Sequence, residues 1–226
     1  MSQVVVYATL LAKGTGVTLS VAVLGLCLAI FLGFLTSLTK MSSRRTIALW
    51  GKAYTHILRG IPDIVIMLLV YFNGQLILNH LMRRLDVQMV EFSPFLAGVI
   101  SIGLLFGAYL CEAFCDVRKN LPKQQIESAM ALGFSPTKSF VFIILPQIII
   151  YALPSINNIW QNILKSAVIV SVLGLSDILH IVEALGRSTG EHFLFICLGM
   201  AIFMTITALS EIFFARMTSK LSIVIN

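Results

Sequence analysis

Long apolar runs separated by short polar segments predict a bundle of membrane-spanning helices. Four runs, at 17–39, 57–78, 95–115 and 193–214, each approach the roughly 20 residues that a helix needs to cross a bilayer. A fifth stretch, 140–175, is interrupted by Pro146 and Pro154. We predict that it holds one span at about 155–175, reached by a helix that approaches along the membrane from Phe140.

The remaining segments are shorter or more polar. Residues 1–13 are apolar but too short to span, and we expect at most a surface helix there. The segment 80–91 is a polar loop, and 176–191 is a polar connection in which we expect a short helix. The predicted fold is therefore all-α, with five transmembrane helices in a single domain over residues 1–226.

Composition and charge support this fold and orient it. Hydrophobic residues make up 58% of the chain and charged residues only 12%, where a soluble domain is about a quarter charged. Five spans place eleven basic residues inside and four outside, whereas six would move Arg216 and Lys220 outside and weaken the bias. We therefore expect the N-terminus outside and the C-terminus in the cytoplasm. Because basic residues gather in the cytoplasmic loops of membrane proteins, the net charge of +6 does not indicate a nucleic-acid partner. The inside set is Lys40, Arg44, Arg45, Lys52, Arg59, Arg118, Lys119, Lys123, Lys138, Arg216 and Lys220, and the outside set is Lys13, Arg83, Arg84 and Arg187.

A polar elbow between two apolar spans is the most informative segment of the sequence, within a loop at about 120–146. The stretch Glu127–Pro146 predicts a short helix, a break and a second helix. Gly133 suits the C-terminal end of the first helix, because glycine adopts the left-handed conformation without penalty. Ser135 can cap the second helix, with Pro136 at its first position. Such an elbow offers a docking surface to a soluble partner, although it can also lie on the membrane surface without one.

The spacing of this elbow resembles the signature of ABC-transporter permease subunits. That signature is Glu-Ala-Ala, then Gly four residues later, then Ile-x-Leu-Pro after a nine-residue gap, and the one departure is Ser128. In that family the loop is a coupling helix that docks on the ATP-hydrolysing subunit. The matching positions are Glu127, Ala129, Gly133, Ile143, Leu145 and Pro146.

Polar residues inside the fourth predicted span are candidates for a solute pathway. Lys165 lies near its middle, and an ionisable residue in a bilayer is by default a functional candidate. Asn158, Gln161 and Lys165 are three and four residues apart, hence on one helix face. Ser166 and Trp160 lie nearby. The alternative is that Lys165 pairs with a carbonyl or an acid and only stabilises packing.

Charged residues near two other span ends have similar alternatives. Arg59, Gly60, Pro62 and Asp63 open the second span, where we expect a structural or gating role. Arg59 and Asp63 are four residues apart and can pair with each other, and Asp63 can instead contact substrate. Glu112 can pair with a basic neighbour, for which Arg118 is one candidate, or gate the path.

Catalysis is not supported by any motif. The chain contains no Gly-x-x-x-x-Gly-Lys-Ser/Thr phosphate-binding loop, and its four histidines have no metal-type spacing. Cys111 and Cys115 share a helix face as packing residues, and Gly103-x-x-x-Gly107 also indicates close helix packing. These observations favour a passage or docking role over an enzyme.

Motifs throughout the chain resemble the polar amino acid uptake permeases, above all the Q-type permeases of histidine and lysine/arginine/ornithine importers. They are Gly14-x-x-x-Thr18-Leu19, Leu58–Asp63, Ser93-Pro94-Phe95, Gly107-Ala108-Tyr109 with Glu112, Leu145-Pro146-Gln147, Ala152-Leu153-Pro154, Asn158-x-Trp160-Gln161, Leu164-Lys165-Ser166 and Val172-x-Gly174-Leu175.

This resemblance implies a subunit of a type I ABC importer in the bacterial inner membrane. Its partners would be a second permease, identical or related, two ATPase subunits that bind ATP and magnesium, and a periplasmic or lipid-tethered binding protein. The cargo would be a polar, basic amino acid. Acidic residues that suit such a cargo are scarce in the fourth span, so we expect a partner permease to supply the carboxylate.

Two other classes of protein remain open from the sequence. A non-transporting membrane scaffold or assembly factor would use the same elbow to bind a soluble partner, and would not need Lys165. A small ion-coupled transporter is a further alternative, but the inverted repeats and intramembrane acids of many such proteins are not apparent here.

Overall fold

A bundle of long helices makes up the protein in a computed structural model, which describes residues 3–88 and 90–222. No strand occurs in these ranges. Five helical stretches, which contain α1, α3, α4, α7 and α9, are long and apolar enough to cross a membrane, as the sequence predicts. The helices are α1 (Gln3–Lys40), α2 (Arg45–Arg59), α3 (Asp63–Leu85), α4 (Pro94–Asn120), α5 (Lys123–Ala131), α6 (Pro136–Ser139), a π-helical turn η1 (Phe140–Ile144), α7 (Leu145–Ala167), a 3₁₀ segment η2 (Val168–Leu173), α8 (Ile178–Thr189) and α9 (His192–Ser222).

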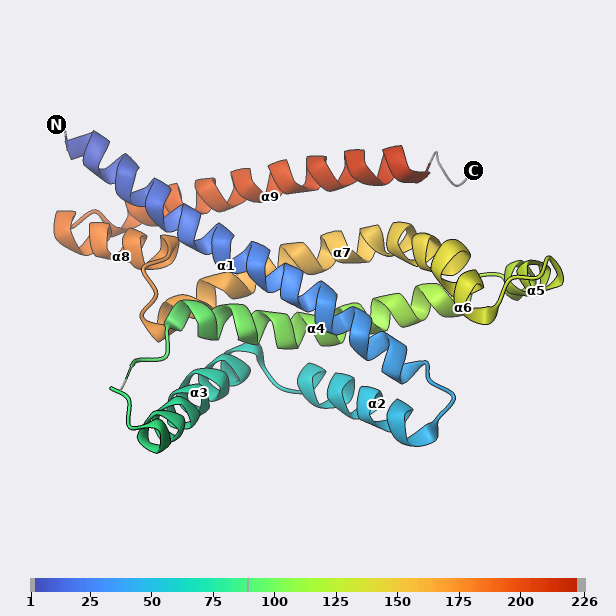
Figure 1. The fold of residues 1–226 in the computed structure, drawn as a ribbon. Helices are drawn as coiled ribbons and strands as arrows, with labels where there is room; N and C mark the ends of the chain where they lie inside the picture. The colour runs from blue at the N-terminus through green and yellow to red at the C-terminus, as the bar shows by residue number, and fades with distance from the viewer. Residues whose placement is uncertain (1–2, 89, 223–226) are drawn as a thin grey trace.

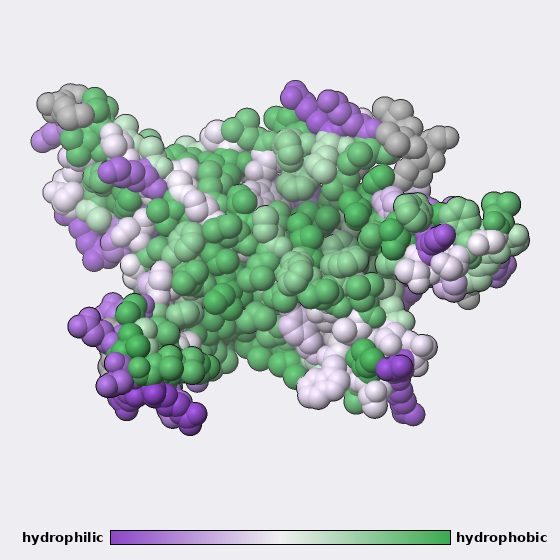
Figure 2. Space-filling model, in the orientation of Figure 1, coloured by the Kyte–Doolittle hydropathy of each residue, from purple (hydrophilic) through white to green (hydrophobic). Residues whose placement is uncertain are grey.

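The long helices lie roughly side by side, so the molecule has two ends (Figure 1). α5 projects from one end, which we call the elbow end, and α8 lies at the opposite end. Figure 2 shows apolar side chains over the middle of the visible face and most of the polar side chains toward the two ends. This distribution is the one expected of a protein whose middle lies in hydrocarbon.

Three predicted boundaries are wrong, because helices continue where we expected them to stop. The polar loop expected at 80–91 is still helical up to Leu85, the last residue of α3. Residues 3–13 are not a separate surface helix but the first turns of α1. Gly14 does not end that helix, because it is buried against α8, where a Cβ would lie 3.0 Å from the Asp177 carbonyl oxygen. The predicted approach helix from Phe140 is likewise continuous with the span, from α6 through η1 into α7. Pro146 follows shortly after this π-helical turn, whose altered hydrogen-bond pattern accommodates a residue without an N–H.

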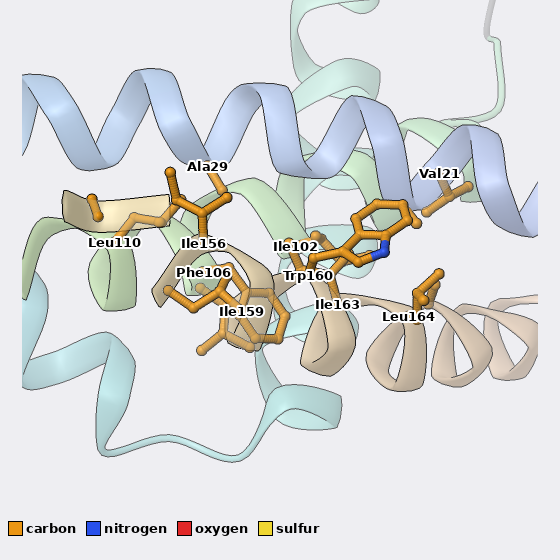
Figure 3. Close-up of a cluster of buried hydrophobic side chains, with 14 of the residues drawn as sticks. Val21, Ala29, Ile102, Phe106, Leu110, Ile156, Ile159, Trp160, Ile163 and Leu164 are labelled. Atoms are coloured by element: carbon orange, nitrogen blue, oxygen red, sulfur yellow. The ribbon is translucent and has the colours of Figure 1, made fainter. Parts of the chain in front are cut away.

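The core forms where α1 crosses α4 and α7. Figure 3 shows Val21 and Ala29 of α1 facing apolar side chains of α4 and α7, among them Ile102, Phe106 and Trp160. The buried face of α1 consists almost entirely of small residues at helical spacing, which lets the backbones approach closely. These residues are Gly14, Thr18, Val21, Ala22, Gly25, Ala29, Gly33 and Ser37. The predicted packing role of Gly103 and Gly107 is confirmed, since added Cβ atoms would meet Leu28 at 2.5 Å and the Tyr54 hydroxyl at 3.0 Å.

Gly33→Ala is expected to destabilise the protein, whereas Gly16→Ala on the same helix is expected to leave stability nearly unchanged. A Cβ at Gly33 would lie 2.9 Å from the carbonyl oxygen of Gly107 and 3.1 Å from the Cys111 nitrogen, both backbone atoms of α4. A Cβ at Gly16 meets nothing within 4 Å. Overpacking of this kind costs about 1–3 kcal/mol. Thermal unfolding of both variants in detergent checks this, and equal melting temperatures would contradict the close α1–α4 contact.

Candidate functional site

Two adjoining pockets lie where the α2–α3 break meets α4 and the last turns of α7. The first, which we call the Asp63 pocket, has a volume of about 470 Å³. It is lined by Asp63, Phe106, Tyr109, Ile159, Asn162, Lys165, Ser166 and Ile169. The second, which we call the cationic pocket, has a volume of about 670 Å³ and shares Tyr109 with the first. It is lined by Lys40, Lys52, Thr55, His56, Arg59, Gly60, Tyr109 and Glu112.

The Asp63 pocket brings a carboxylate and an ammonium group together from distant parts of the chain. Asp63 is the first residue of α3, where the helix dipole favours a negative charge. The Ser166 hydroxyl donates a hydrogen bond of 2.6 Å to its Oδ2 atom. Lys165, which directly precedes Ser166 in α7, is exposed and lines the same pocket. An acid of this same chain therefore lies in the pocket of Lys165, although the fourth span itself supplies none.

The cationic pocket is organised around Glu112. The carboxylate of Glu112 forms ion pairs with Lys40 of α1 and, at 3.6 Å, with Arg59 at the end of α2. The Arg59 guanidinium also lies 5.1 Å from the centre of the Tyr109 ring, a cation–π distance. The predicted pairing of Glu112 with a basic neighbour is confirmed, with Lys40 and Arg59 as the cations rather than Arg118. The Arg59–Asp63 pair is wrong, because Arg59 reaches Glu112 while Asp63 binds Ser166.

Tyr54 holds α2 against α4 and so positions Arg59. Its hydroxyl donates a hydrogen bond of 2.7 Å to the carbonyl oxygen of Leu104. Burial raises the pKa of Tyr54 to about 12, so the hydroxyl keeps its proton, and the hydrogen bond, throughout the neutral range. Because α2 runs back along α4, the break at Gly60–Pro62 lies beside the middle of α4 (Figure 1). The segment Arg59–Asp63 opens the second span, as expected, since Asp63 is the first residue of α3.

The predicted pathway residues do not all face these pockets. Lys165 and Ser166 line the Asp63 pocket, and Glu112 lines the cationic pocket. Trp160 instead packs in the core, 7% exposed, because five residues in a helix place it far around the axis from Lys165. Asn158 is exposed, on the helix face of Lys165, whereas both amide atoms of Gln161 are buried.

Three residues that line the Asp63 pocket were not predicted from the sequence as pathway candidates. They are Phe106, Tyr109 and Asn162. Asn162 lies three residues before Lys165, so the spacing rule that selected Asn158 and Gln161 also applies to it. Tyr109 belongs to one of the family-like motifs, but nothing in the sequence places its ring beside Arg59. Phe106 carries no signal that separates it from ordinary core aromatics.

The elbow adopts the predicted helix–turn–helix. Gly133 has a φ of +85°, and the N–H groups of Phe134 and Gly133 donate to the carbonyls of Ala129 and Met130. These two bonds form a Schellman motif at the end of α5. The hydroxyl of Ser135 accepts a hydrogen bond from the Lys138 N–H, and Pro136 follows at the start of α6. The predicted caps are thereby confirmed.

The elbow exposes an apolar tip. Leu132 is 79% exposed, and Met130 and Phe134 are exposed as well. Glu127 and Ser128 are exposed on α5, while Ala129 is buried. Ile143 lies in η1, and Leu145 and Pro146 begin α7. Exposed apolar side chains at the polar end of a bundle mark an interaction surface.

A helical bundle with a projecting elbow and polar pockets beside its spans is consistent with a membrane transport component. The chain belongs to the family of binding-protein-dependent transport system inner membrane components, whose model matches residues 15–222. It is 36% identical over 205 residues to the histidine/lysine/arginine/ornithine transport system permease protein HisQ of Escherichia coli K12, covering 91% of this chain and 90% of that protein. It is 31% identical over 219 residues to the arginine ABC transporter permease protein ArtQ of the same organism, covering 91% and 92%.

Solved structures agree with this assignment. An amino acid ABC transporter crystallised with histidines superposes with a TM-score of 0.81 at 26% identity, covering 96% of each chain. The MetNI methionine ABC transporter in an inward-facing conformation has a TM-score of 0.76 at 13% identity, over 98% of this chain and 99% of that one. The fold is therefore that of type I ABC importer permeases.

Proposed function

We propose that this chain is the permease subunit of an ATP-driven importer of basic amino acids in the bacterial inner membrane. A second permease, identical or related, completes the pathway. Two partner subunits bind and hydrolyse ATP with magnesium, and a periplasmic or lipid-tethered binding protein delivers the cargo. The distribution of basic residues supports an outside N-terminus and a cytoplasmic elbow end.

The observation that carries the cargo class is that Asp63 and Lys165 both line one pocket. A basic amino acid has a carboxylate, which matches the Lys165 ammonium, and cationic groups, which match the Asp63 carboxylate. Charge-assisted hydrogen bonds of this kind are the stronger ones. Phe106 and Tyr109 add aromatic surface to the same pocket, which suits a cation. The names of HisQ and ArtQ support the same class of cargo.

The elbow supports the proposed ATPase docking. Its exposed apolar tip at Met130, Leu132 and Phe134 needs a partner that covers it, and α5 lies at the end where the basic residues gather. Closure of the ATPase subunits would move the elbows and bias the bundle between inward- and outward-facing states. A partner can shift such an equilibrium only by binding one state better than the other.

Reconstitution of the purified complex tests the proposal. The chain is purified from membranes, its co-purifying subunits are identified, and the complex is placed in liposomes with candidate binding proteins. We expect an ATPase in the complex whose hydrolysis rises with a binding protein loaded with lysine, arginine or histidine, and rises less with glutamate. A folded chain that co-purifies with no ATPase would overturn the importer and favour the membrane scaffold.

A further inference from the structure

We propose that Gln147 is a positioning residue that links the elbow mechanically to the Asp63 pocket. This inference rests on the proposed function and adds the connection between its two sites. The Nε2 atom of Gln147, on α7, donates a hydrogen bond of 2.9 Å to Oε1 of Gln125, on α5. The same atom donates a second hydrogen bond of 2.9 Å to the carbonyl oxygen of Ile143.

Only one orientation of the Gln147 amide group satisfies both of its hydrogen bonds. A backbone carbonyl only accepts hydrogen bonds, so the Gln147 NH₂ group must face Ile143. Its other proton then needs an acceptor, which the Gln125 oxygen supplies. The Gln125–Gln147 bond is the only side-chain hydrogen bond between α5 and a spanning helix among the side chains that the structure describes.

A hollow beside this bond separates the elbow from the bundle. A pocket of about 540 Å³ lies between the end of α4, the start of α5 and the first half of α7. Its lining includes Asp116, Asn120, Gln125, Gln147 and Tyr151. Ile126 and Ala129 pack inward from α5, but the space around Gln125 is open, so α5 can shift relative to α7 while the amide pair holds their spacing.

The backbone next to Gln147 is suited to movement. The preceding turn, η1, is π-helical, with the Leu145 N–H bonded to the Phe140 carbonyl, and such turns are frequent at functional sites. Pro146 follows and has no N–H to donate. The second bond of Gln147, to Ile143, spans this irregular turn and joins it to the elbow.

The far end of the same helix holds the Asp63 pocket. α7 continues from Leu145 to Ala167, with Pro154 inside it, and packed helices are among the elements that carry coupling between distant sites. Ser166, near its end, binds Asp63, and Lys165 lines the pocket. The connection therefore runs from α5 through Gln125 and Gln147 along α7 to Ser166 and Asp63.

Gln147→Leu is the sharpest test, because leucine is close in size to glutamine and has no group that can bond to either end of the Gln125 amide or to the Ile143 carbonyl. We expect the variant complex to assemble and hydrolyse ATP, while amino acid transported per ATP hydrolysed falls about fivefold or more, the lower range of measured allosteric couplings. Gln125→Glu keeps the acceptor and is expected to retain the wild-type ratio. Gln124→Glu makes the same charge change on the exposed neighbour and serves as a second control.

A second pair of variants keeps the test decisive if Gln147→Leu does not fold. Gln125→Leu removes the acceptor from the other side, and Gln125→Lys combined with Gln147→Glu replaces the tie by an ion pair, so the ratio should fall in the first and be retained in the second. An unchanged ratio in Gln147→Leu or Gln125→Leu, or a loss confined to thermal stability, would overturn the link. Absence of transport by the wild-type complex would instead overturn the proposed function itself.

Discussion

Asp63→Asn is expected to reduce ATP-driven uptake of lysine and arginine about thirtyfold, without loss of folding. Asparagine has nearly the same size as aspartate. Its Oδ1 can still accept the hydrogen bond that Ser166 donates to Asp63, which is 2.6 Å long in the unaltered protein. The contact between α3 and α7 is therefore kept, and the variant loses only the negative charge in the pocket of Lys165. A hydrogen bond between charged groups contributes about 2 kcal/mol, which corresponds to roughly thirtyfold in affinity or rate.

Initial rates of uptake into proteoliposomes measure this effect, with basic and neutral amino acids compared at equal loading of the binding protein. Asp86→Asn is the matched control, because Asp86 is an exposed residue in the left-handed conformation at the end of α3, which asparagine also tolerates. We expect that control to transport normally. Equal losses for basic and neutral cargo in Asp63→Asn would show that Asp63 supports the structure rather than selecting a cation.

Gly133→Val is expected to lower ATPase docking and uptake at least about tenfold, whereas Gly133→Asn retains most of both. The φ of +85° at this position is strained for a β-branched residue, at a cost of about 1–3 kcal/mol, but is more accessible to asparagine. No atom lies within 4 Å of an added Cβ, so the effect acts through the backbone alone. Valine would open the turn that joins α5 to α6 and displace the apolar tip.

Co-purification of the ATPase and uptake measured on the same preparations check this prediction. Insertion of the five spans should be unaffected, because the turn at Gly133 lies between α5 and α6, outside the spanning helices, and no residue of it belongs to the core. Chain yield and melting temperature report on that control. A valine variant that docks and transports like the asparagine variant would show that the left-handed turn is not required for coupling.

Local features were predictable from the sequence, because each depends on neighbours along the chain. The five spans follow from apolar length, and the turn at Gly133 and the cap at Ser135 follow from the conformations that those residues favour. Helix ends were less predictable. The stretch before Gly14 and the turn around Pro146 remain helical because packing against α8 and a π-helical turn accommodate residues that often end helices.

The composition of the pockets was decided by the tertiary structure. Asp63 and Ser166 are 103 residues apart, and Lys40 and Glu112 are 72 apart. Their meeting depends on how each helix is rotated and how closely α1 and α4 approach, which the small residues of α1 allow. Spacing along one helix could show that Lys165 shares a face with Asn158. Only the packing of α3 and α4 shows that the face of Lys165 lines a pocket and that the face of Trp160 lies in the core. The sequence by itself therefore determined the membrane fold and the elbow, through local hydrogen bonding and apolar length. The tertiary structure determined which charges face one another, because that depends on contacts between helices far apart in the chain.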